Sequence, residues 1–219
     1  MLIDVIVSLV LVAAGVFAMR MYLDGEKEKG SEGAFTLSAR RMGLLLLIGL
    51  LAAGGMIAVL NGVYHLPLLE RLKRLVLVLS IYPAAVIDAR LRKLPNPFLL
   101  FTLGARVVLL LIELAVDASA AWNTLKDCLL GAVILAAFFL LMLLVFKGSI
   151  GMGDIKLFGL IGLYKGIWGS VQAVFYALVV SFVVAIVLLI ARKKSRKDSI
   201  PFGPSIAFGA FLACMLSGV

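Results

Sequence analysis

Runs of apolar residues recur along almost the whole chain, and they limit its possible folds more than any other feature. A helix needs about 20 such residues to cross the hydrocarbon core of a bilayer. The 219 residues are 63% hydrophobic, whereas a soluble domain is typically about 45–50% apolar. Because lipid offers the backbone no hydrogen-bond partners, segments of this kind must cross as helices. The sequence therefore predicts an all-α fold, a polytopic membrane helical bundle.

About eight transmembrane helices are expected from the positions of these runs. The third and sixth are short. The expected spans cover, roughly, residues 2–19, 42–64, 75–89, 98–116, 127–146, 154–168, 170–191 and 201–218.

The distribution of charge predicts how the bundle is oriented. The net charge is +9, and 15 of the 21 Lys and Arg residues lie in loops 20–41, 90–97, 147–156 and 192–200, which alternate as loops on one side would. Cytoplasmic loops collect such residues, so we expect this side to face the cytoplasm. Segment 65–74 is basic yet falls on the outer side, and its pattern favours a short interfacial helix. No basic stretch interleaves with aromatic residues, so no nucleic-acid partner is expected.

Two carboxylates stand at the ends of apolar runs, where a charge is costly and often functional. Asp88 ends the third expected span; alternatively, it is an interfacial acid paired with Arg92, one helical turn on. Asp154 begins the sixth span and follows Gly151 and Gly153, which let a backbone turn tightly. Its alternative role is that of an N-capping residue after a glycine loop.

Asp88 and Asp154 considered together support a more specific functional prediction than either residue does alone. In the expected topology, Asp88 and Asp154 both emerge on the cytoplasmic side at similar depth. Two adjacent carboxylates cannot both ionise easily, so they share a proton. One can then act as a base on water while the other acts as an acid. This pattern predicts peptide hydrolysis without a covalent intermediate.

The remaining acids and the cysteines favour structural roles. We expect Asp4 to be solvated near the outer end of the first span. Glu113, nearer the middle of a span, is expected to pair with Arg106 two turns earlier or to face a polar interior. Cys128 and Cys214 lie in apolar segments without a CxxC pattern, so neither a disulfide nor a structural zinc site is expected.

Three motifs in order resemble those of one family. Asp88 is followed by Leu94-Pro95-Asn96; Gly151-Met152-Gly153-Asp154-Ile155-Lys156-Leu157 forms the second element; and Ile200-Pro201-Phe202-Gly203-Pro204 enters the last span. The chain resembles the type IV prepilin peptidases and their archaeal preflagellin-processing relatives, which are GxGD aspartic proteases of the membrane.

The resemblance implies an endopeptidase that removes the basic leader of prepilin-like precursors after a glycine. The resemblance also implies that residues 75–219 form a GxGD peptidase core. Residues 1–74 precede this core and would comprise two spans, a short cytoplasmic loop and the interfacial segment. The enzyme would lie in the cytoplasmic membrane of a prokaryote, with its site facing the cytoplasm and with no metal or cofactor. The implied catalytic residues are Asp88 and Asp154, and the implied supporting residues are Gly151, Gly153, Lys156, Pro95 and Asn96.

One departure from the family pattern bears on activity. Larger bacterial members carry an insertion after the first span, with zinc-binding cysteines, and also methylate the new terminus. Here loop 20–41 has no cysteine, so methyltransferase activity is not expected. A small transporter that uses Asp88, Asp154 and Glu113 as ion sites is the main alternative, and a non-catalytic scaffold is a third. The oligomeric state is left open.

Overall fold

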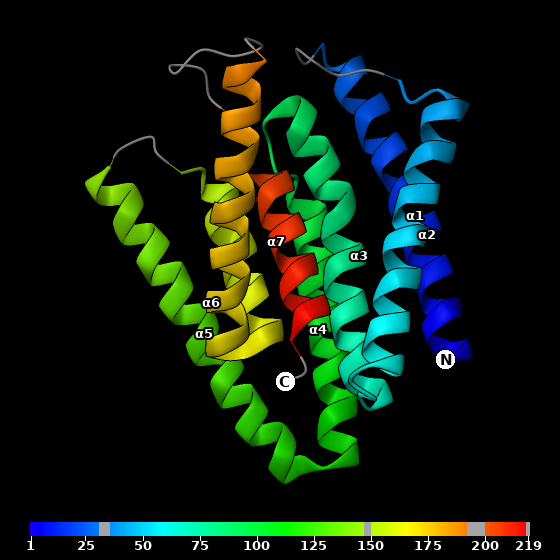
Figure 1. Ribbon diagram of the computed structural model, residues 1–219, viewed down its shortest axis with the longest axis vertical. Helices are drawn as coiled ribbons and strands as arrows, with labels where there is room; N and C mark the ends of the chain where they lie inside the picture. Colours follow the sequence, from blue (N-terminus) through cyan, green and yellow to red (C-terminus); the bar gives the residue numbers. More distant parts are fainter. Residues whose placement is uncertain (31–35, 147–149, 192–199, 218–219) are drawn as a thin grey trace.

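Every regular element in the described part of the chain is a helix. The computed structural model describes residues 1–30, 36–146, 150–191 and 200–217 (Figure 1). The prediction of an all-α bundle is therefore confirmed. The helices are α1 (Leu2–Glu28), α2 (Ala39–Gly62), α3 (Leu68–Leu91), α4 (Asn96–Val116), α5 (Ala118–Val145), α6 (Met152–Ile190) and α7 (Gly203–Leu216).

Helix α3 forms the centre of the bundle. It packs against α1, α2, α4, α6 and α7, and most of its residues from Arg71 to Asp88 are buried. The C-terminal ends of α1, α3 and α6 lie at the same end of the molecule, next to the N-terminal end of α2 (Figure 1). Neighbouring helices thus run up and down the bundle, as successive membrane crossings would.

Helix α6 is interrupted at Gly166. This residue has φ 67° and ψ −167°, a backbone conformation that is essentially restricted to glycine. The parts of α6 before and after Gly166 run back alongside each other (Figure 1), so residues from both parts, including Asp154 and Leu178, line one cavity. The sixth and seventh expected spans both fall within α6, and the chain reverses close to the predicted break between them.

Five helices are long and apolar enough to cross a membrane, namely α1, α2, α4, α5 and α6. Within the described residues, α3 does not meet this criterion because it carries several charges, and α7 has only 14 residues. The count of about eight crossings accordingly stays a prediction.

The basic segment 65–74 differs from its expected form. Residues from Leu68 onward belong to α3, so the predicted interfacial helix and the third span are one helix, and the expected division after residue 74 falls inside it. Arg71, Lys73 and Arg74 are buried. Hydropathy alone could not predict this, because it treats each charge as a group that must reach water.

Acids from other helices explain why Lys73 and Arg71 can be buried, whereas Arg74 Nη1 donates to the carbonyl oxygen of Cys214 at 3.1 Å. Lys73 Nζ lies 2.8 Å from Glu113 Oε1, and Arg106 Nη1 lies 3.0 Å from Glu113 Oε2. The predicted pairing of Glu113 with Arg106 is confirmed, with Lys73 as a second partner. Asp4 is fully buried and lies 3.1 Å from Arg71 Nη2, so the expectation that it is solvated is wrong: the segment that was expected at the surface supplies its partner.

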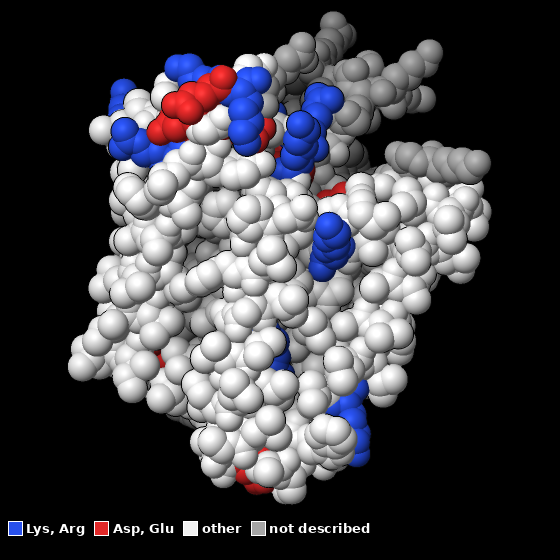
Figure 2. Space-filling view, turned by 180° about the vertical axis from the view of Figure 1, so that it is seen from behind, with Lys and Arg blue, Asp and Glu red and all other residues white. Residues whose placement is uncertain are grey.

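The exposed charges are unevenly distributed. Figure 2 shows Lys, Arg, Asp and Glu gathered at one end of the molecule, above a broad surface with few charges. Exposed basic residues at this end include Arg20 and Lys27 on α1, Arg41 on α2, and Arg90 after Asp88 on α3. The uncharged surface below it is the kind that lipid covers.

Candidate active site

Asp88 lies in the last turn of α3, where the helix ends at an unusual cap. Arg92 adopts a left-handed conformation with φ 53°, and its backbone N–H donates to the carbonyl oxygen of Asp88 at 2.9 Å. The backbone N–H of Gly203, at the start of α7, donates to Asp88 Oδ2, also at 2.9 Å. Asp88 is only 6% exposed. The carboxylate is thus held by a residue far away in sequence.

Gly203 is a site residue that the sequence analysis did not single out. A Cβ atom at this position would lie 2.7 Å from Asp88 Oδ2 and 3.0 Å from Asp88 Cγ, so a side chain here would displace the carboxylate. The one sequence signal was the resemblance of the segment from Ile200 to Pro204 to a family motif, which gave no role to its glycine.

Asp154 is placed by the two glycines that precede it. Gly151 is the N-cap of α6, and its backbone N–H donates to Asp154 Oδ2 at 3.3 Å. Asp154 therefore stands in the first turn and reaches back to the cap, as an acid in a capping box does. The alternative interpretation of Asp154 as the N-cap residue itself is wrong, because Gly151 holds that position.

The segments that contain Asp88 and Asp154 contact each other through residues close to the two acids. A Cβ atom at Gly153 would lie 2.9 Å from Leu94 Cβ, so the start of α6 packs closely on the residues that follow α3. Lys156 Nζ donates to Asn96 Oδ1 at 3.1 Å. Pro95 is buried as the N-cap of α4. Of the predicted supporting residues, Gly153, Lys156 and Asn96 therefore lie in the contact between these two segments, and Gly151 lies beside Asp154.

Asp88 and Asp154 line the same cavity, which has a volume of about 540 Å³. Because two charges of the same sign close together disfavour joint ionisation, such a pair holds one proton most easily. Polar and apolar surfaces meet here, since the rest of the wall is mostly apolar. The other lining residues are Arg92, Phe138, Phe139, Met142, Ile150, Gly151, Val174, Leu178, Ser181, Ile200, Pro201 and Phe202.

The alternative interpretations of Asp88 fit this geometry less well. An interfacial acid paired with Arg92 would be solvated, whereas Asp88 is buried and bound by the N–H of Gly203. The transporter interpretation grouped Glu113 with Asp88 and Asp154. In the described residues, Glu113 does not line their cavity and is neutralised by Lys73 and Arg106.

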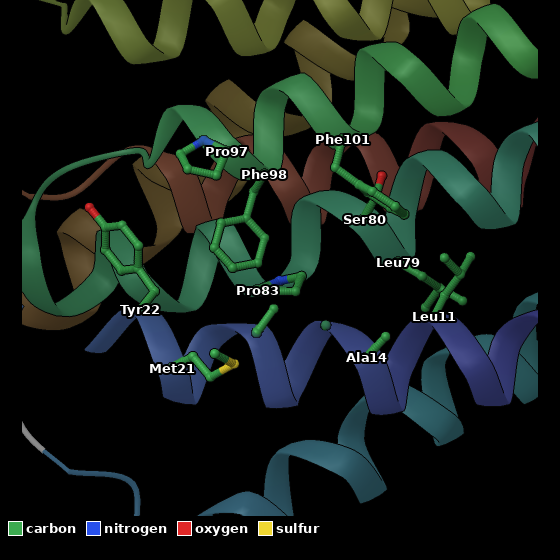
Figure 3. A pocket seen from close by; sticks show the side chains of 12 residues that line it. Leu11, Ala14, Met21, Tyr22, Leu79, Ser80, Pro83, Pro97, Phe98 and Phe101 are labelled. Carbon is green, nitrogen blue, oxygen red and sulfur yellow. The ribbon is translucent and has the colours of Figure 1, made fainter. Parts of the chain in front are cut away.

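A second cavity, with a volume of about 420 Å³, differs from the first because no acid is among the described residues that line it. It lies between α1, α3 and α4, with Tyr22, Pro83 and Phe98 on its walls (Figure 3). Among the described residues that line it, Tyr22 and Ser80 are the polar ones, and none is a carboxylate. This cavity therefore lacks the pair of acids that lines the cavity of Asp88 and Asp154.

Comparisons with known proteins agree with the site. A sequence profile described as the Type IV leader peptidase family matches residues 75–190, which include both acids. A prepilin leader peptidase/N-methyltransferase of Bacillus subtilis (strain 168) is 28% identical over 145 residues, a match that covers 66% of this chain and 56% of that protein. One of Pseudomonas putida is 30% identical over 155 residues, covering 67% and 50%.

The chain spans about half the length of the curated relatives it matches. No solved structure matches it significantly. The family profile nevertheless covers more than half of the chain and reaches from the core of α3 to the end of α6. The chain therefore belongs to the type IV leader peptidase family.

Proposed function

We propose that this protein is a membrane-embedded aspartic endopeptidase that removes the basic leader peptide from type IV prepilin-like precursors. The observation that carries the proposal is the single cavity shared by Asp88 and Asp154, two acids from different helices. Each carboxylate accepts a hydrogen bond from a backbone N–H, that of Gly203 or that of Gly151. Membership of the leader peptidase family supports the same chemistry.

The proposed reaction needs one proton on the pair of carboxylates. The ionised carboxylate takes a proton from a water molecule, whose oxygen attacks the carbonyl carbon of the scissile peptide bond. The protonated carboxyl group donates a hydrogen bond to the carbonyl oxygen and later a proton to the leaving nitrogen. The C–N bond then breaks, leaving a carboxylic acid and an amine. Because the pair titrates as a unit, the proton belongs to both groups.

The location of the cavity supports cleavage at a membrane surface. Asp88, which shares the cavity with Asp154, is in the last turn of α3, and this helix ends at the same end of the bundle as α1 and α6 (Figure 1). Exposed charges gather at one end of the molecule (Figure 2), and the excess of basic residues in the loops favours the cytoplasmic side. The apolar walls from α5 and α6 suit the apolar segment of a precursor. We therefore propose a multi-pass protein of the prokaryotic cytoplasmic membrane whose site faces the cytoplasm and cleaves after a glycine.

We propose peptidase activity alone. The curated relatives are named for both leader peptidase and N-methyltransferase activity. In this chain, segment 20–41 holds no cysteine that could contribute to a zinc site. The carboxylate chemistry described above needs no metal or cofactor.

Co-expression with a prepilin-like precursor tests the proposed function. Leader removal is followed by gel shift and by N-terminal sequencing, for the wild type, Asp88→Asn, Asp154→Asn and the control Asp24→Asn, a half-buried acid on α1 that does not line the cavity. Cleavage after glycine should occur in the wild type and in the control, and should be lost in both site variants at equal membrane levels. Absence of cleavage by the wild type, or its survival in either site variant, would contradict the proposal.

A further inference from the structure

Ser181 places a hydroxyl group on the wall of the carboxylate cavity, and the proposed chemistry leaves this group unused. It stands on the part of α6 that follows Gly166. Val174, Leu178 and Ser181 all line the cavity, and their spacing of four and three residues puts them on one face of the helix. Ser181 is partly exposed, toward a space that Asp88 and Asp154 share.

The hydroxyl of Ser181 differs from several others in these helices. A serine or threonine inside a membrane helix usually donates to the carbonyl oxygen one turn earlier. Ser80 does so to Val76 at 2.6 Å, Thr102 to Phe98 at 2.8 Å, and Thr124 to Ala120 at 3.0 Å. Within the described residues, no hydrogen bond joins the side chain of Ser181 to another group. Its hydroxyl is therefore free to bind a molecule that enters the cavity.

The depth of Ser181 suits a contact close to the reacting bond. The two parts of α6 run antiparallel from Gly166 (Figure 1), and Asp154 and Leu178 are equally far from that glycine along the chain. Residues equally far from the reversal lie at similar depth. Ser181 follows Leu178 by three residues, or about 4.5 Å of helix rise toward the charged end. An extended peptide with its reacting bond beside Asp154 would pass this hydroxyl.

We propose that Ser181 binds the precursor by donating a hydrogen bond to a main-chain carbonyl oxygen next to the scissile bond. This inference rests on the proposed function, since it names the group that holds the substrate at the same site. An extended peptide in a mostly apolar cavity has unsatisfied main-chain groups, and leaving one unpaired is costly. Ser181 supplies a partner from the part of the cavity wall that α6 forms after Gly166.

Steady-state cleavage of a synthetic prepilin-like precursor by the purified full-length chain in detergent tests this inference. The variants are Ser181→Ala, Ser181→Val and Ser181→Thr; valine and threonine have the same shape and differ in the hydroxyl. Loss of one hydrogen bond should raise KM about three- to tenfold in the alanine and valine variants. The kcat should stay near the wild-type value if the bond is equally strong in the ground and transition states. Threonine should restore KM.

Two results would overturn the inference: an unchanged KM in the alanine and valine variants, or a threonine variant as impaired as the valine variant. The control Thr124→Val removes a hydroxyl that bonds within its own helix, and should leave both constants unchanged. Asp88→Asn, measured in the same assay, distinguishes a failure of the proposed function from a failure of the proposed role of Ser181. If it still cleaves, the proposed function itself fails; if it does not cleave while Ser181→Ala behaves as wild type, only the role of Ser181 is wrong.

Discussion

At the scale of single residues, backbone groups rather than charged side chains hold the two acids. Gly203 donates to Asp88 and Gly151 donates to Asp154. A Cβ atom would lie 2.7 Å from Asp88 Oδ2 at Gly203 and 3.2 Å from Asp154 Oδ2 at Gly151, so the approach is closest at Gly203. A backbone donor at a helix start moves little and needs no side-chain entropy to be ordered. The acids are thus fixed in position while water and substrate can still reach them through the cavity.

Gly203→Ala should separate activity from folding. The added Cβ would lie 2.7 Å from Asp88 Oδ2, which is the mobile end of a side chain, so the fold should tolerate it. The carboxylate must shift, however, and a displacement of about 1 Å at a catalytic group can cost about 10²-fold in rate. Cleavage rates and thermal unfolding in detergent should be measured beside Gly104→Ala, whose Cβ meets nothing within 4 Å. Equal rates for the two variants would refute this role of Gly203.

At the scale of elements, α6 contributes both an acid and the wall that faces it. The reversal at Gly166 brings Val174 and Leu178 to the cavity that Asp154 lines. Close packing supports the reversal, because a Cβ at Gly162 would lie 2.5 Å from the backbone of Ala132 on α5. The site therefore depends on a turn far from the chemistry.

Gly166→Ala should destabilise the fold. Its φ of 67° with ψ of −167° is strained for alanine, at a cost of about 1–3 kcal/mol, and the added Cβ would collide with the carboxylate of Asp127. We expect a lower unfolding temperature in detergent than for the wild type and for Gly54→Ala, a helical glycine with open space around it. An unchanged unfolding temperature would mean that the reversal is not strained as described.

Lys156 on α6 and Asn96 on α4 should affect cleavage through one shared interaction. Because Lys156 donates to Asn96, removing either partner breaks the same hydrogen bond. Lys156→Met and Asn96→Ala should each slow cleavage, by about tenfold or less for a single partly solvated bond, and the double variant should be no slower than the slower single variant. Rate losses that multiply in the double variant would show that the two residues act independently.

At the scale of the whole molecule, the structure has two polar regions of different kinds. One is the site near the charged end; the other is the buried ion cluster in which Glu113 neutralises Lys73 and Arg106. In the second region the ion pairs of Glu113 with Lys73 and Arg106 join different turns or helices, so these cations stabilise the packing of the bundle. These buried basic residues do not indicate which side of the membrane a segment faces, because that rule applies to basic residues in loops. The basic segment 65–74 is therefore compatible with the outer side.

Glu113→Gln should reduce stability without changing the site. It removes the acid of the buried pair with Arg106 and leaves Lys73 with Glu70 as its acidic partner, and breaking a buried pair in this way typically costs about 3–5 kcal/mol. Thermal unfolding in detergent should show a large loss compared with Glu28→Gln, an exposed control. The fraction that remains folded should keep its kcat, since Glu113 does not line the cavity. A selective loss of kcat at unchanged stability would instead indicate a part in the chemistry.

Whether a feature of the fold or of the site could be predicted from the sequence depends on how far apart in the chain the interacting residues are. Asp88, Asp154 and the two glycines before Asp154 belong to local motifs, and the pairing of Glu113 with Arg106 follows from helical spacing; all of these could be predicted. The contacts of Gly203 with Asp88 and of Asp4 with Arg71 join segments far apart in sequence. A single sequence contains no signal for such contacts, so the burial of the basic segment could not be foreseen.

Single-turnover cleavage by the purified chain tests most directly whether Asp88 and Asp154 act as one pair. Rates would be measured for the wild type, Asp88→Asn, Asp154→Asn and the double variant, with Asp24→Asn as the control. Each single site variant should lose about 10²–10⁴-fold in rate, and the double variant should lose no more, because removing either acid disables the pair. A single variant that cleaves at the wild-type rate, or losses that multiply in the double variant, would contradict a shared role.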